Sequence, residues 1–198
     1  MLTGDEIYRQ VLTGGIQITP FDERNLNPNS YNLSVSQHVL VYDKHLPAID
    51  YFEERYKSGD TDFPVIEPLD MGLEELTTAL EIPLGGMVLW PGVVYLLSTV
   101  EKTFAGDLIP AIDGRSSVGR LGVCVHVTAG FGDIGFSGHW TLEVVVPSPV
   151  VIYPFTPMCQ VSFSSPTGTT GRRYEGGYQN QSHLPQPSKS FRWFRSKK

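Results

Sequence analysis

Glycine and proline interrupt nearly every apolar run of this chain, and this spacing limits the possible folds more than any other feature. The 198 residues include 20 glycines and 15 prolines. Residues 87–100 are divided at Pro91-Gly92, and the apolar runs between residues 144 and 163 are separated by Pro147, Pro149, Pro154 and Pro157. Proline breaks helices and removes a ladder donor, so such runs predict short strands joined by turns. We therefore expect an all-β domain, a distorted jelly roll or β-barrel.

One short helix is expected at the N-terminus. Thr3 and Glu6 have the spacing of a capping box, and apolar residues recur at helical intervals until Gly14-Gly15. Residues 31–36 alternate between apolar and polar side chains, which predicts a half-buried strand.

Three segments are less regular. Residues 51–57 and 72–76 could each be a short helix or a surface excursion, and we expect their charges to form a solvated face. Over residues 168–190 Thr, Gly, Gln, Ser and Pro dominate, and such a segment cannot hold a fold by itself. We divide the chain into a barrel domain, residues 1–167, and a C-terminal tail, residues 168–198. We expect the tail to close over the barrel or to pack on a neighbouring subunit.

Composition excludes several classes of protein. The net charge of −6 argues against a general nucleic-acid surface, which needs a basic face. No apolar run is long enough to span a bilayer, and the first residues lack the pattern of a secretory signal. Cys124 and Cys159 lie in apolar runs and are expected to be reduced core thiols. We expect a soluble, cytoplasmic protein without nucleic-acid or membrane partners.

Residues 111–146 hold most of the polar groups suited to chemistry. A glycine-punctuated turn, residues 114–120, carries two arginines and two serines, which suit phosphate oxygens as donors. A glycine-rich loop with Asp133 follows, and then an apolar strand with Glu143. Strand alternation places Glu143 opposite the larger apolar face, where it can line a pocket and take and give a proton. Taken alone, the glutamate could also be a structural ion-pair partner, and the turn a surface turn.

The histidines do not form a recognisable metal motif. His38, His45, His126, His139 and His183 are scattered, and the H-x-E and P-C-x-x-C signature of zinc deaminases is missing. We expect each histidine to be structural or at the surface, and we assign no metal ligand among the side chains.

The stretches GRSSVGRLG (114–122) and HVTAGFGDIGFSGHWTLE (126–143) resemble the signature of the dCTP deaminases of the trimeric dUTPase superfamily. Further likeness at residues 20–22, 27–31, 89–92, 178–181 and 187–188 extends over nearly the whole chain. The resemblance implies a dUTPase-like barrel and a zinc-independent deamination of dCTP. Gly130-Phe131 resembles the pair found in bifunctional members, which continue to dUMP and diphosphate.

The resemblance also implies roles for individual residues. Glu143 would be the general base toward water and then the proton donor, and Ser116 would help to hold that water. Arg120 would come from a neighbouring subunit. Asp133 would meet the sugar 3′-hydroxyl and orient a second water toward the α-phosphorus. Phe136 would lie under the deoxyribose, although core packing is an equal alternative on sequence alone.

The remaining implied nucleotide contacts come from the basic turn, the strand and the tail: Arg115, Ser117, Val118, Gly119, Thr141, Leu142, Gln160, Tyr174 and Gln181. Thr141 and Leu142 would meet the pyrimidine through backbone groups. Mg²⁺ bound through the triphosphate and a homotrimer with sites between subunits are implied as well.

Two positions depart from the family pattern. Ile134 stands where proline is common, and Gly177 where a lysine often precedes the tail tyrosine, so triphosphate affinity or tail closure could differ. Arg172 and Arg173 could compensate. Alternative functions are a monofunctional deaminase releasing dUTP, a plain dUTPase, and a non-catalytic nucleotide-binding regulator.

Overall fold

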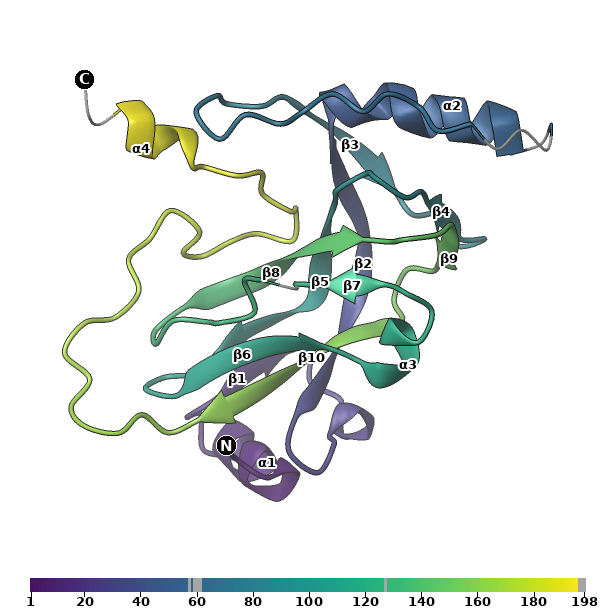
Figure 1. The fold of residues 1–198 in the computed structure, drawn as a ribbon. Coiled ribbons are helices and arrows are strands. Elements are labelled where there is room, and N and C mark those ends of the chain that lie inside the picture. Colours follow the sequence, from purple (N-terminus) through teal and green to yellow (C-terminus); the bar gives the residue numbers. More distant parts are fainter. Residues whose placement is uncertain (57, 59–61, 127, 196–198) are drawn as a thin grey trace.

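The structure, a computed structural model, describes residues 1–195 except 57, 59–61 and 127 (Figure 1). Its main sheet has eight strands, of which six follow the order β6-β10-β2-β5-β8-β7, while β1 pairs with β5 and β3 with β2. All these pairings are antiparallel. The bounds are β1 Gln17–Thr19, β2 Tyr31–Tyr42, β3 Thr77–Glu81, β5 Tyr95–Phe104, β6 Ile109–Gly114, β7 Cys124–Val125, β8 Ser137–Val145 and β10 Pro157–Ser164. A second sheet pairs β4 (Met87–Leu89) with β9 (Val150–Ile152).

The main sheet curves into a nearly closed barrel, so the all-β expectation is confirmed. Its two outer strands, β6 and β7, are joined through the chain that follows β7. Phe131 forms a bridge with Ala111 of β6, the Ile112 N–H donates to the Gly130 carbonyl at 2.7 Å, and the Gly132 N–H donates to the Pro110 carbonyl at 2.9 Å. The glycine-rich loop therefore closes the barrel.

Short helices lie at the periphery (Figure 1). They are α1 (Gly4–Leu12), η1 (Glu23–Asn25), η2 (Asp43–His45), α2 (Leu46–Tyr56), α3 (Ser116–Gly119) and α4 (Phe191–Arg195). The expected N-terminal helix is confirmed, and the Thr3 hydroxyl accepts the Glu6 N–H at 3.3 Å as its cap. Segment 51–57 lies in α2 up to residue 56, whereas residues 72–76 form no helix.

The expectation of a half-buried strand at residues 31–36 is wrong, because both faces of this part of β2 are buried. The apolar face contributes to the core, and the polar face is covered by neighbouring loops and strands. Ser36 Oγ lies 3.3 Å from Ser98 Oγ, and Asn32 Oδ1 accepts from Asn27 Nδ2 at 2.9 Å. The alternation identifies the polar residues correctly, but it does not reveal that other segments cover them.

The C-terminal tail leaves β10 at residue 164 and passes beside β8 before ending in α4 (Figure 1). Phe191 is buried, and the Ser190 hydroxyl donates to the Met71 carbonyl at 2.9 Å. The tail therefore packs on its own chain, and packing on a neighbouring subunit stays a prediction. In the part of the chain that the structure describes, no helix has the length and apolarity needed to cross a membrane.

Candidate active site

A cavity of about 630 Å³ lies between β8, the Asp133 loop, the end of β2 and the C-terminal tail. It brings together side chains that are far apart in the sequence. Those that matter for the chemistry are Tyr42, His126, Phe131, Asp133, Phe136, Thr141, Glu143, Tyr174 and Gln181.

Strand β8 divides its side chains between this cavity and the core. Thr141 and Glu143 line the cavity, as alternation requires, whereas Leu142 between them is fully buried on the opposite face. The Glu143 side chain is 46% exposed. It is therefore a solvent-accessible carboxylate on the cavity wall, within reach of a small ligand.

The free edge of β8 is flanked by two segments. Glu143 accepts the His126 N–H through its carbonyl at 3.1 Å, and His139 donates its N–H to the Gln181 carbonyl at 3.1 Å. Backbone groups of alternate residues face the same edge of a strand. The N–H and C=O of Thr141 therefore point into the interval between His126 and Gln181, where a flat ring with donors and acceptors at its edge can pair with them.

Glu143 has an ion-pair partner that sequence reasoning missed. The buried ring of His126 contacts a Glu143 carboxylate oxygen through Nδ1. His126 follows β7, which pairs with β8 at residues 144 and 145, and its φ of 55° turns the chain at that point. The sequence places His126 in the family signature, but no spacing rule indicates that its ring faces Glu143.

Close backbone packing explains two glycines of the loop. A Cβ on Gly130 would lie 2.2 Å from the Ile112 carbonyl oxygen, and one on Gly132 would lie 2.7 Å from the Pro110 carbonyl oxygen. Only glycine permits these approaches. The same contacts leave the Phe131 side chain 75% exposed at the mouth of the cavity.

Asp133 begins a tight turn, in which its carbonyl accepts the Phe136 N–H at 3.1 Å. Its exposed carboxylate lines both the main cavity and an adjoining hollow of about 480 Å³. Gly135, at φ 88°, completes the turn against the side chain of Arg173, and Ile134 accepts the Tyr174 N–H at 2.8 Å. The tail therefore binds this loop at Ile134, the position where the family commonly has a proline.

The adjoining hollow is partly basic. Arg172 and Arg173 line it, and Arg173 pairs with Asp107 at 2.5 Å. Arg172 is exposed.

An aromatic cluster forms another wall of the cavity. The Phe136 ring lies 4.5 Å from Trp140 and 5.9 Å from Tyr174, measured between ring centroids. Phe136 is 8% exposed and lines the cavity, so the same side chain both packs in the core and faces the cavity. At the end of β2, burial raises the pKa of the Tyr42 phenol, and its oxygen accepts the Ser188 N–H at 3.2 Å.

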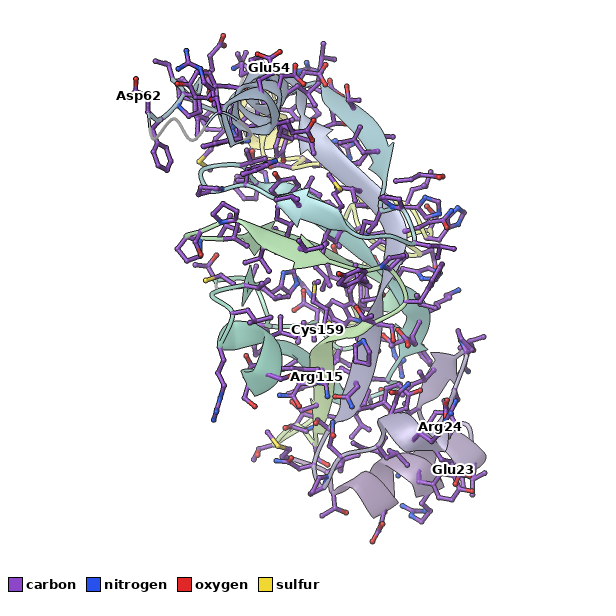
Figure 2. The ribbon with its side chains drawn as sticks, turned by 90° about the vertical axis from the view of Figure 1, so that its right-hand side faces the viewer. Glu23, Arg24, Glu54, Asp62, Arg115 and Cys159 are labelled. Atoms are coloured by element: carbon purple, nitrogen blue, oxygen red, sulfur yellow. The ribbon has the colours of Figure 1, made fainter. Side chains whose placement is uncertain are left out.

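The basic turn does not line this cavity. Residues 116–119 form α3, and Ser116, Ser117, Gly119 and Arg120 are exposed on the chain's surface. Arg115 instead donates through Nη1 to the Pro157 carbonyl at 3.0 Å, and Figure 2 shows it beside β10, close to Cys159.

Gln160 is also used within the chain. Its amide accepts from Ser30 Oγ at 2.8 Å and donates to the Gly114 carbonyl at 3.0 Å, so it supports the turn rather than the cavity.

The cysteines differ from expectation in one respect. Cys159 is buried, whereas Cys124 is exposed, and both are free thiols. Exposure of Cys124 follows from its place at the edge of β7, where its side chain points away from the core.

Comparison with known proteins gives a consistent result. A family model described as dCTP deaminase-like matches residues 1–165. Two curated relatives are named dCTP deaminase, dUMP-forming. The relative from Clostridium beijerinckii is 39% identical over 194 residues, covering 98% of each chain, and that from Hathewaya histolytica is 40% identical over 194 residues, covering 98% of this chain and 99% of its own.

Among solved structures, 2′-deoxycytidine 5′-triphosphate deaminase from Agrobacterium tumefaciens superposes with a TM-score of 0.56 at 18% identity. The match covers 82% of this chain and 47% of that chain. This similarity supports the fold.

Proposed function

The chain belongs to the dCTP deaminase-like family, and on that premise we propose that it hydrolyses dCTP to dUTP and ammonia and then forms dUMP and diphosphate. The curated relatives named as dUMP-forming, matched over nearly their whole length, support both steps. The observation that carries the proposal is the single cavity in which Glu143, Asp133, Phe136 and the open edge at Thr141 face one another.

Deamination needs one group that first accepts and then donates a proton, and Glu143, which lines the cavity, would be that group. It takes a proton from water, whose oxygen forms the new bond to C4 of the cytosine. The carboxyl group passes this proton to the ring nitrogen N3, takes the second proton from the new hydroxyl at C4, and delivers it to the amine. The C4–N4 bond then breaks, and ammonia leaves as the C4 carbonyl forms. The buried His126 ring contacts the carboxylate and would orient it for this transfer.

Base and sugar recognition follow from the other walls. The Thr141 N–H and C=O match the acceptor and donor edge of a pyrimidine, and Gln181 holds the Thr141 hydroxyl. Leu142, buried on the other face, would act through the position of the strand alone. The Phe136 ring, packed against Trp140 and Tyr174, would lie under the deoxyribose and exclude a ribose 2′-hydroxyl.

The second step would use Asp133, whose exposed carboxylate lies between the main cavity and the hollow lined by Arg172 and Arg173. It orients a water toward the α-phosphorus, the bond from that phosphorus to the bridging oxygen breaks, and diphosphate leaves. Gly130 holds the loop close to β6, and Phe131 stands exposed at the mouth of the cavity.

The site would take residues from a second copy of the chain, because the basic turn that the family resemblance assigns to the site is exposed and apart from the cavity of its own chain. In a homotrimer, Ser116 and Arg120 of one subunit would complete the site of the next, with Ser117, Val118 and Gly119 offering backbone and hydroxyl donors to phosphate oxygens. Arg115 and Gln160 support the turn in its own subunit.

A triphosphate substrate requires a divalent cation, and the residues fit Mg²⁺ carried by the nucleotide. Among the described residues, no three His, Cys, Asp or Glu side chains are grouped as a metal site, and Asp133 offers an accessible carboxylate. Magnesium, when bound, would neutralise phosphate charge while keeping several of its waters.

Incubation with dCTP and magnesium tests the proposal, with nucleotides separated by chromatography and ammonia measured in parallel. We expect ammonia, dUMP and diphosphate in equal amounts. Accumulation of dUTP would show a monofunctional deaminase, and conversion of dUTP without any action on dCTP a plain dUTPase. Binding of dCTP without turnover would show a regulator. CTP is the matched control and is expected to remain unchanged because of Phe136.

A further inference from the structure

Three of the five histidines meet where the tail crosses the barrel. His38 lies on β2, His139 on β8 and His183 in the tail. The ring of His183 lies 5.1 Å from that of His38 and 6.5 Å from that of His139, measured between centroids. His139 Nδ1 is 3.0 Å from the Thr99 carbonyl oxygen, which fixes its ring in place.

This contact lies beside the bonds that seat the tail over the cavity. Gln181 is 4% exposed and bonds to the Thr141 hydroxyl, which also accepts the Gln186 N–H at 3.0 Å. The His183 carbonyl accepts from Ser98 Oγ at 2.5 Å. All these bonds join neutral groups, so the imidazoles are the groups at this contact whose charge changes near neutral pH.

Charged residues of β5 and β3 flank the contact on its two sides. Lys102 of β5 stands opposite His139 in the β5–β8 register. Burial lowers the pKa of the His139 ring, the hydrogen bond to the Thr99 carbonyl opposes this shift, and the nearby His183 and Lys102 add to the lowering. On the other side Glu81 of β3 stands opposite His38 in the β2–β3 register, and Gln37 Nε2 donates to Glu81 at 3.5 Å.

We propose that His38, His139 and His183 form a pH-sensitive latch that keeps residues 181–186 over the cavity while the rings are neutral and releases them when the rings are protonated. The direction of the pH effect follows from the geometry. Protonation places like charges 5.1–6.5 Å apart in the closed tail, and opening of the tail separates them. Even with the screening of bulk water, the two repulsions favour opening by about tenfold. Histidine is the side chain whose charge ordinarily changes between about pH 5 and 8, and burial lowers the pKa of His139, so we expect release toward the acidic end of this range.

Hydrogen–deuterium exchange of tail peptides covering residues 179–188 tests this latch in the full chain without nucleotide. Rates at pH 8 and pH 5.5 are corrected for intrinsic exchange, and a β10 peptide serves as the internal reference. We expect the open fraction of the tail to rise about tenfold at pH 5.5 while β10 stays protected.

The variant His183→Gln removes the titrating ring but keeps the backbone carbonyl that accepts from Ser98. We expect it to lose at least half of the pH response, in logarithmic terms, and His38→Gln to lose a smaller share. A pH-independent wild-type tail, or a His183→Gln variant that keeps more than half of the response, would overturn the latch.

The latch depends on the proposed function only for the role of the cavity that the tail covers. Exchange is measured without substrate, so a failure of dCTP turnover would refute the proposed function but not the latch. Normal turnover together with a pH-independent tail would refute the latch but not the proposed function.

Discussion

Replacing Glu143 by glutamine separates its chemical role from its structural role. The amide keeps the length and shape of the side chain but cannot cycle a proton. Because the carboxylate is 46% exposed, losing its ion pair with His126 should cost at most about 1 kcal/mol of folding stability. General acid–base catalysis supplies about 10²- to 10⁴-fold in rate, or roughly 3–5 kcal/mol. Ammonia release should therefore fall by at least a hundredfold while the fold survives.

Ammonia release from dCTP, nucleotide affinity by calorimetry and thermal unfolding would be measured on the same preparation. The exposed Glu53 of α2 offers a matched control, and Glu53→Gln should behave as the unchanged chain in all three assays. Full deamination by Glu143→Gln, with dUTP or dUMP formed at the normal rate, would refute the assignment of the proton carrier.

Three further substitutions test other parts of the argument. Asp133→Asn should weaken nucleotide binding and stop dUMP formation while ammonia release persists, as product chromatography would show; unchanged dUMP formation contradicts its role. Gly130→Ala places a Cβ 2.2 Å from the Ile112 carbonyl oxygen and should destabilise the barrel by about 2–4 kcal/mol, lowering the melting temperature by roughly 5–15 °C. Gly85→Ala, with no atom within 4 Å, should melt like the unchanged chain, and equal melting of both variants refutes the closure argument. Burial raises the pKa of the Glu101 carboxyl, so the folded state favours its protonated form, and this contribution to stability is lost as pH rises through the raised pKa. Glu101→Gln should therefore raise the melting temperature at pH 8, with the gain disappearing near pH 4; an equal gain at both pH values contradicts this sign.

Features that depend on a residue's own backbone could be predicted from the sequence. The cap at Thr3 and the break at Pro91-Gly92 give α1 and the boundary between β4 and β5. Alternation correctly predicted that Glu143 and Leu142 face opposite ways. The resemblance to dCTP deaminases is confirmed by the family match over residues 1–165.

Other features depend on which strand lies next to which, and only the tertiary structure decided them. The contact between His126 and Glu143 exists because β7 pairs with β8 in one register. The closed barrel exists because Gly130 approaches β6, and the exposed α3 lies apart from the cavity of its own chain. Periodicity and turn chemistry depend on a few neighbouring residues. Strand register, barrel closure and the position of the tail depend on residues far apart in the sequence. A single sequence therefore identifies the chemical groups of the site but does not show which of them lie together.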